Sequence, residues 1–279
     1  MNIAVKITDI KWGEKSLISL YVSVVSGLVL ALQYNPEHPF YSAVSLDMLI
    51  PFGAFWRSLH FYSSQIFFLL SAVHLLAIIY NGSYLRLSLA KWIILVGTLP
   101  AGVLLLFTGY VLRGDITGES AGIIAEQLCL TIPYIGELLN SMLFALLEEG
   151  VKRVYANHLI GLGVIWGILA WDHLRRYRVS LSSHGLLILL MTGMALLWDA
   201  PMETMQPGMT HIAGPWFFLG IQELLRYIHP LWSGVLFPLV FVVAVAVIRV
   251  EDPWRKRAVF FSIAWLFIYG VATVIALFR

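Results

Sequence analysis

Four histidines lie inside strongly apolar segments of this 279-residue chain, and they form two pairs with almost the same spacing. His60 and His74 are 14 residues apart, and His158 and His173 are 15 apart. On an α-helix these steps advance about 21 and 22 Å and return the side chain close to its starting face. Each helix would present one imidazole toward each side of a hydrocarbon core about 30 Å thick. The pattern predicts two bis-histidine haem sites stacked across a membrane.

The direction in which the predicted helices cross the membrane determines which histidines pair with each other. Both pairs lie in segments that would cross the membrane in the same direction, so His60 should face His158 near the outer surface and His74 should face His173 near the inner one. Two axial imidazoles saturate the iron, which favours electron transfer over oxygen binding. The alternative is that each histidine is a packing residue with a hydrogen bond to a neighbouring helix. Ionisable residues in membrane spans are costly, which favours the functional interpretation.

The composition is that of an integral membrane protein. Hydrophobic residues make up 59% of the chain and charged residues 12%, and the mean hydropathy is +0.83. A soluble protein of this length needs more charge to cover its surface. The single cysteine, Cys129, excludes both an intramolecular disulfide and a Cys-x-x-Cys-His haem attachment, so any haem would be bound non-covalently.

Apolar runs of membrane-spanning length predict an all-α fold with about seven transmembrane helices. The fifth run is short and would need local thinning of the bilayer or extension toward Ser182. The runs are Ser16–Gln33, Phe55–Tyr80, Trp92–Leu112, Val154–Trp171, Gly185–Trp198, Leu231–Ile248 and Val259–Phe278.

The charges of the loops predict the orientation. With the N-terminus in the cytoplasm, 12 of the 18 basic residues fall on the cytoplasmic side, as the positive-inside rule requires. The C-terminus would then be external. The net charge of +2 gives no reason to expect a nucleic-acid partner.

The polar segment Arg175–Ser183 divides the chain into two predicted parts. Residues 1–180 would form a four-helix, haem-binding bundle, and residues 181–279 a three-helix C-terminal part. Two long external loops, Gly114–Arg153 and Pro201–Pro230, would border the haem-binding bundle. A site between these loops would face outward.

Further residues suit a haem. Arg57 lies one helical turn before His60 and Arg153 lies five residues before His158, where a guanidinium could bind a haem propionate. The alternative is an arginine whose charged end reaches the membrane surface. Gly13 and Gly27 are 14 residues apart, and with Gly109 they could let a flat macrocycle approach the helix backbone. Glycine is common in membrane helices in any case.

Several motifs resemble the cytochrome b subunit of quinol–cytochrome c reductases. The chain is most similar to a short form in which the four-helix cytochrome b of the chloroplast type is fused to a three-helix subunit IV. The motifs that carry the resemblance are Arg57-Ser-Leu-His60 with His74, Tyr80-Asn-Gly-Ser-Tyr84, Gly109-Tyr-Val-Leu112, Ile132-Pro-Tyr-Ile-Gly136 and Arg153 to His158.

The resemblance implies two non-covalent b haems, quinone as substrate and lipid as surroundings. His60 and His158 would hold the low-potential outer haem, and His74 and His173 the inner one. The implied partners are an iron–sulfur protein of the Rieske type, a c-type cytochrome, or both. The resemblance also implies a homodimer within a larger complex, located in a bacterial inner membrane.

The chain departs from the family at its outer quinol site. Arg113-Gly114-Asp115 replaces the family's Pro-Trp-Gly, and Leu95 stands where a fourth packing glycine is expected. Gly214-Pro215-Trp216-Phe217 replaces Pro-Glu-Trp-Tyr, so the glutamate thought to accept a quinol proton is absent. Pro215 and Trp216 remain as candidate residues of this site.

Quinol oxidation needs a base, and Glu223 is the main candidate. It lies seven residues after Trp216 on a predicted surface helix, Trp216–Tyr227. Asp115, His211 and His229 are weaker candidates, and each of the four, Glu223 included, could be only a solvated loop residue. On the inner side, a quinone pocket could be lined by Lys15, Arg175, Arg176 and His184, although the positive-inside rule alone would place basic residues there.

Three functions remain open at this point. The first is the dihaem membrane subunit of a quinol-oxidising respiratory complex, which would need partner subunits for turnover. The second keeps both haems but makes the protein a non-bifurcating electron conduit between the quinone pool and another redox module. The third is a cofactor-free membrane subunit whose histidines are structural.

Overall fold

The computed structural model describes residues 10–204 and 212–279, and in these residues all regular structure is helical. Five helical segments are long and apolar enough to cross a membrane: Trp12–Ala31, Gly53–Tyr80, Leu89–Val111, Lys152–Leu174 and Trp254–Leu277. Two shorter apolar segments, Ser182–Leu197 and Leu231–Val247, match the fifth and sixth predicted runs. The expectation of an all-α membrane protein with about seven spanning helices is confirmed.

The chain forms two compact units that alternate along the sequence. The first unit comprises Met1–Ser88 and Ala170–Met202, and the second comprises Leu89–Leu169 and Glu203–Arg279. The division of the chain near residue 180 into a haem-binding part and a C-terminal part stays a prediction.

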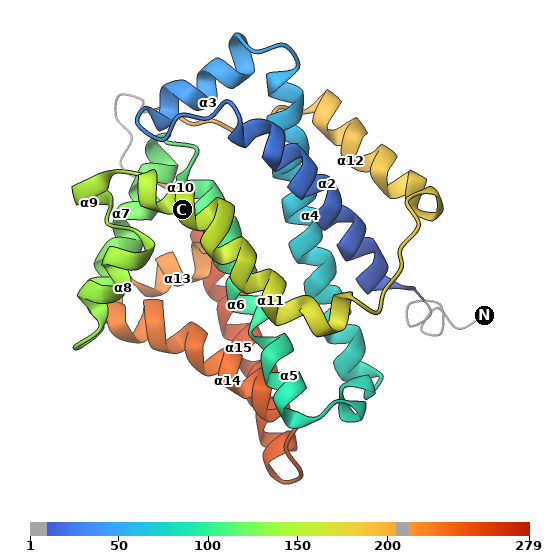
Figure 1. Ribbon diagram of the computed structural model, residues 1–279. Helices are drawn as coiled ribbons and strands as arrows, with labels where there is room; N and C mark the ends of the chain where they lie inside the picture. The colour runs from blue at the N-terminus through green and yellow to red at the C-terminus, as the bar shows by residue number, and fades with distance from the viewer. Residues whose placement is uncertain (1–9, 205–211) are drawn as a thin grey trace. The chain divides into compact units, whose positions relative to one another are not determined.

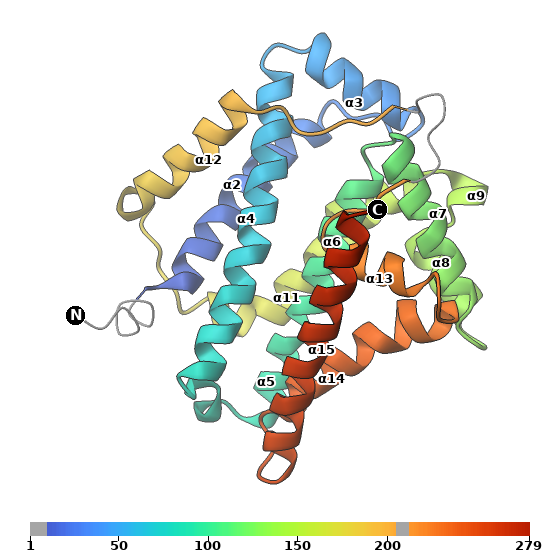
Figure 2. The same ribbon diagram turned by 180° about the vertical axis from the view of Figure 1, so that it is seen from behind.

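Helix α2 runs along α4 in the first unit, as both views show (Figures 1 and 2). Helix α12 packs against the same pair, and α3 contacts α4. Ile18, Leu59, Met191 and Ala195 form the apolar core between these helices. The helices of this unit are α2 (Trp12–Ala31), α3 (Pro39–Met48), α4 (Gly53–Tyr80) and α12 (Gly185–Leu197), with short 3₁₀ turns at Ser83–Arg86 and Ser182–His184.

Serines on α2 explain its close contact with α4. Ser16, Ser19, Ser23 and Ser26 are all buried, and their spacing of three and four residues places them on one face of the helix. Small side chains let two membrane helices approach closely. The Ser16 hydroxyl lies 2.7 Å from the hydroxyl of Ser71 on α4, so polar groups inside this contact are satisfied.

The second unit combines membrane helices with short helices. Helix α15 lies beside α13 and α14 (Figure 2), and the Trp265 ring of α15 stacks on Phe237 and Phe241 of α14. The helices are α5 (Leu89–Val96), α6 (Thr98–Val111), α7 (Ile116–Leu130), α8 (Gly136–Leu143), α9 (Leu146–Glu149), α10 (Lys152–Ala156), the first part of α11 (Leu162–Leu174), α13 (Leu219–Leu224), α14 (Phe237–Val247) and α15 (Trp254–Leu277), with π-helical turns at Asn157–Gly161 and Leu231–Leu236.

The predicted surface helix Trp216–Tyr227 is wrong at both ends, because α13 covers only Leu219–Leu224. The chain makes a turn before α13, in which the Pro215 carbonyl accepts hydrogen bonds from the amides of Phe218 and Leu219. At the end of α13 the backbone hydrogen bonds join residues three positions apart; for example, the amide of Arg226 donates to the carbonyl of Glu223. Such bonds tighten the last turn and end the helix.

Candidate functional site

His74 of α4 and His173 of α11 face each other within the first unit. Their ring centroids are 6.2 Å apart, with an angle of 43° between the ring planes. An imidazole nitrogen lies about 2 Å from a bound first-row metal, so two rings that share one metal ion have centroids about 6 Å apart. The observed separation matches the distance expected for two rings that bind one metal ion from opposite sides.

The Nε2 atom of His74 is buried and has no hydrogen-bond partner among the described residues. Buried polar atoms in proteins nearly always have a partner, and an exception calls for an explanation. A metal bound to Nε2 provides one. The described residues contain no group of three or more His, Cys, Asp or Glu side chains placed to hold a bare metal ion. A haem needs only two ligands from the protein, because its macrocycle supplies the other four.

Gly13 and Gly27 of α2 each lie directly against one of the two histidines of α4. A Cβ atom on Gly13 would lie 2.9 Å from Cε1 of His74, and one on Gly27 would lie 2.8 Å from Cε1 of His60. In the second unit, a Cβ atom on Gly109 would lie 3.0 Å from Cε1 of His158. The three glycines singled out in the sequence thus provide the room that three of the four imidazoles occupy.

The tautomer of His60 is determined by its hydrogen bond. Its Nδ1 atom lies 2.8 Å from the backbone carbonyl oxygen of Ser23. A carbonyl only accepts, so Nδ1 carries the proton and Nε2 of the neutral ring carries the lone pair. Histidines that bind metals usually make this kind of second hydrogen bond. The sequence offered no signal for this contact, since it uses the backbone of Ser23.

His158 lies in the π-helical turn Asn157–Gly161, where the amide of Leu162 donates to the carbonyl of Asn157, five residues earlier. Single π turns within α-helices occur often at functional sites. The Asn157 side chain donates to the carbonyl of Met142 at 2.7 Å, which ties the turn to the C-terminal end of α8. The Thr108 hydroxyl oxygen lies 3.0 Å from Nδ1 of His158. Sequence reasoning missed both Asn157 and Thr108, although Thr108 directly precedes Gly109.

The two arginines proposed for propionates already have protein partners. Arg57 donates from Nε and Nη2 to the two carboxylate oxygens of Asp47, each at 2.6 Å, and from Nη2 to the carbonyl of Ala200 at 2.6 Å. Arg153 donates to the carbonyl of Ser141 and to the carboxylate of Glu149. A guanidinium has five N–H groups, so a second anion can share it. Their role toward a propionate stays a prediction.

The segment that departs from the family motif forms a buried ion pair. Arg113 pairs with Asp115, whose side chain is fully buried. Asp115 also accepts hydrogen bonds from the backbone amide of Gly118 at 2.9 Å, as the N-cap of α7, and from that of Glu203 at 2.8 Å. Asp115 is therefore fully engaged, and it links the start of α7 to the segment that follows α12.

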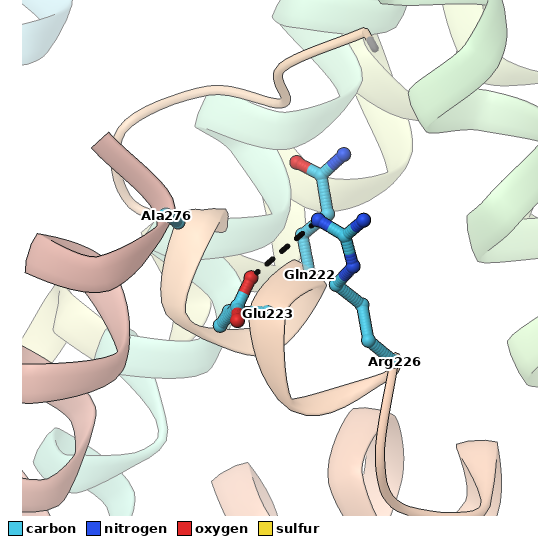
Figure 3. A pocket seen from close by; sticks show the side chains of 4 residues that line it. All are labelled: Gln222, Glu223, Arg226 and Ala276. Carbon is cyan, nitrogen blue, oxygen red and sulfur yellow. Dashed lines mark ion pairs between the residues drawn. The ribbon is translucent and has the colours of Figure 1, made fainter. Parts of the chain in front are cut away.

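Glu223 has a nearly buried side chain, 5% exposed, next to a pocket of about 140 Å³. Gln222, Arg226 and Ala276 line the rest of this pocket (Figure 3). The Glu223 carboxylate accepts a hydrogen bond from the Tyr227 hydroxyl at 3.0 Å and lies 3.3 Å from Arg279 and 3.8 Å from Arg226.

The remaining outer candidates differ in exposure. Pro215 is buried and Trp216 is 45% exposed, and both belong to the turn before α13. His229 is exposed, and His211 lies outside the described residues. Burial, helped by the charge of Glu126, raises the pKa of the Cys129 thiol to about 11. The thiol stays protonated at neutral pH, so Cys129 is no redox nucleophile.

The inner candidates form only one partial cluster. His184 is buried, with Nε2 at 3.8 Å from the Glu14 carboxylate and Nδ1 at 3.1 Å from the carbonyl of Ser180. Arg175 pairs with Asp172 at 3.0 Å on the protein surface. The contacts of His184 are with Glu14 and Ser180, so among the described residues the predicted set of Lys15, Arg175, Arg176 and His184 is not brought together.

Part of the chain is similar in sequence to known cytochromes b6. Residues 65–183 match the family model described as cytochrome b (N-terminal)/b6/petB. The chain is 28% identical over 173 residues to cytochrome b6 of Heliomicrobium gestii, covering 60% of this chain and 81% of the relative. It is 29% identical over 158 residues to cytochrome b6 of Heliobacterium mobile, covering 55% of this chain and 74% of that relative.

The fold is similar to that of a chain in a solved structure titled "Hyperthermophilic respiratory Complex III". The TM-score is 0.69 at 18% identity, and the match covers 95% of this chain and 82% of the other. At this identity the similarity shows the fold alone. It covers much more of the chain than residues 65–183, the segment that matches the family model. Residues 65–183 thus match a domain of the cytochrome b6/petB type, and the chain as a whole is similar to short, b6-like cytochromes b.

Proposed function

We propose that this chain is the dihaem cytochrome b subunit of a quinol-oxidising, bc-type respiratory complex. His60 and His158 would hold an outer b haem, and His74 and His173 an inner one. A bis-imidazole haem b supplies one-electron transfer at an iron with no open position. The observation that carries the proposal is the contact of His74 with His173 at 6.2 Å, together with the partnerless Nε2 of His74.

The surroundings of the other two histidines support the outer pair. His60 and His158 each lie against a glycine, and each has its Nδ1 atom within hydrogen-bond distance of an oxygen. The two rings belong to different units, yet they have the same kind of environment. Arg57 and Arg153 would bind propionates while keeping their carboxylate partners.

Quinol would be oxidised near the outer haem, with Glu223 accepting a proton at its carboxylate. The 140 Å³ pocket beside Glu223 and the buried position of that carboxylate support this role. Pro215 and Trp216 would shape the approach to the pocket. The Glu223 carboxylate lies 3.3 Å from Arg279 and 3.8 Å from Arg226, at the edge of the same pocket.

The proposal includes partners and an orientation. Electrons would leave through a Rieske-type iron–sulfur protein or a c-type cytochrome, since the lone Cys129 cannot hold either cofactor. The subunit would be a homodimer in a bacterial inner membrane, with the N-terminus in the cytoplasm and the C-terminus outside. Residues 1–180 would form the haem-binding part and residues 181–279 the C-terminal part.

A non-bifurcating electron conduit is the second candidate. It is favoured by the loss of the family's outer glutamate and by the full engagement of Asp115 within the protein. Oxidant-induced reduction of haem b in the presence of an inner-site inhibitor separates the two functions. Reduction on addition of a high-potential acceptor supports bifurcation, and its absence supports the conduit.

The haem content of the purified complex tests the proposal itself. A pyridine haemochrome assay should give two b haems for each copy of this chain. His74→Ala should remove one haem, and His229→Ala, at an exposed histidine outside the site, should remove none. Absence of b-type absorption bands in the native protein would leave only the third function, a cofactor-free subunit.

A further inference from the structure

The Thr108 hydroxyl lies at hydrogen-bond distance from His158, one of the four histidines proposed as haem ligands. Thr108 belongs to α6, is 2% exposed, and its Oγ1 atom lies 3.0 Å from Nδ1 of His158. The two residues are 50 positions apart in the chain but belong to the same compact unit. The contact therefore joins α6 to the π turn that carries His158.

The direction of this hydrogen bond follows from counting hydrogens. The Thr108 hydroxyl has one hydrogen, and it points to the helix carbonyls of Leu104 at 2.8 Å and Leu105 at 3.1 Å. The oxygen can then only accept from His158, so Nδ1 of His158 carries the proton. In a neutral imidazole this leaves the lone pair on Nε2. Thr108 thus selects the tautomer that can bind a metal through Nε2.

His60 reaches the same tautomer by another route. Its Nδ1 atom donates to the backbone carbonyl of Ser23 at 2.8 Å. A backbone carbonyl is present whatever side chain occupies the position, whereas the hydroxyl of Thr108 depends on the residue type. The short contact of His158 Nδ1 with Thr108 can therefore be removed by a side-chain substitution, whereas the short contact of His60 Nδ1 with the Ser23 carbonyl cannot.

We infer that Thr108 is a positioning residue that orients His158 and sets the electron-donating strength of this ligand toward the outer haem. The inference rests on the proposed function, in which His158 is an axial ligand. Donation of the Nδ1 proton to an acceptor makes the ligand nitrogen more basic, and this stabilises the oxidised iron. Removal of the hydroxyl should make the midpoint potential of the outer haem more positive.

Two variants of Thr108 separate the hydroxyl from the packing of the side chain. Thr108→Val keeps the branched shape and removes the acceptor, and Thr108→Ser keeps the hydroxyl. Thr98→Val is the matched control on the same helix, because the Thr98 hydroxyl donates only to the carbonyl of Leu95 at 2.6 Å. Each variant is purified in the complete complex and examined by potentiometric titration and by low-temperature EPR of the low-spin haems.

Thr108→Val should shift the potential and the EPR signal of one haem and leave the other unchanged. Thr108→Ser and Thr98→Val should resemble the native protein. Selective loss of one haem in Thr108→Val, with both retained in Thr108→Ser, also supports the inference. It is overturned if Thr108→Val keeps both haems with native potentials and EPR signals, or if Thr98→Val changes them as much. A native protein without b haems would instead refute the proposed function.

Discussion

Arg57 and Asp47 form a bidentate ion pair, in which Nε and Nη2 of the guanidinium each lie 2.6 Å from a different carboxylate oxygen. The same arginine binds the carbonyl of Ala200, and its side chain is 11% exposed. The pair ties α3 to α4 at the position where a haem propionate is expected. Arg57 therefore has two candidate roles, one toward Asp47 and one toward the cofactor.

Substitutions on both sides of this pair distinguish the two roles. Asp47→Asn and Arg57→Gln should each lower the free energy of unfolding by about 1.5–3 kcal/mol, the usual value of a charged hydrogen bond. Only Arg57→Gln should also shift the potential of the outer haem, because only this variant removes the propionate's partner. Thermal unfolding and redox titration of both single variants and the double variant provide the data. Equal haem potentials in Asp47→Asn and Arg57→Gln would reduce Arg57 to a structural role.

Gly13 should be essential for the inner haem. In Gly13→Ala the new Cβ atom would lie 2.9 Å from Cε1 of His74, so the ring must move out of its position. We expect the haem content to fall from two to one for each chain. Gly193→Ala on α12 is the control, since a Cβ atom there meets no atom within 4 Å. Full haem content in Gly13→Ala would show that the contact does not restrict the His74 ring.

The π turn at His158 explains why the second histidine pair has the longer spacing. A π turn accommodates one residue more than an α turn. Fifteen residues that include it advance about as far as the 14 α-helical residues from His60 to His74.

Single-residue deletions test this explanation. Deletion of Ile160, an exposed residue inside the π turn, should convert the turn to α-helix and leave two haems in place. Deletion of Leu69, an exposed residue between His60 and His74, should remove at least one haem, because α4 has no π turn to absorb it. Haem stoichiometry is the measurement. The explanation fails if both deletions have the same effect.

Asp115 should stabilise the second unit at the start of α7. Asp115→Ala removes the N-cap of α7, the bond to the amide of Glu203 and the partner of the buried Arg113. Removing one partner of a buried ion pair costs about 3–5 kcal/mol. Thermal unfolding should show this loss, whereas Glu119→Gln, at an exposed position of the first turn of α7, should change stability by less than about 0.5 kcal/mol. Similar melting temperatures for both variants would contradict the assignment.

The sequence allowed good predictions where side-chain type and spacing carry the information. The positions of the spanning helices and the all-helical fold follow from long apolar runs. The contacts of Gly13 and Gly27 with His74 and His60 follow from one shared spacing of 14 residues on two adjacent helices. In each case the α-helix has a fixed rise and rotation per residue, so the spacing of two residues in the sequence gives their relative positions on the helix.

The contacts that orient the histidines could not be predicted in this way. His60 donates to a backbone carbonyl, which every residue possesses, so Ser23 gives no signal in the sequence. The π turn at Asn157 depends on a shift of a single backbone hydrogen bond. The short length of α13 is set by turns on both sides, and apolar residues continue beyond its end, so the sequence does not show where the helix ends.

A cryo-electron microscopy map of the purified complex tests the central claim most directly. The claim predicts planar density with a central iron between Nε2 of His74 and Nε2 of His173, and a second such feature between His60 and His158. Density in which the rings of His74 and His173 pack directly against side chains, with no macrocycle between them, would contradict it.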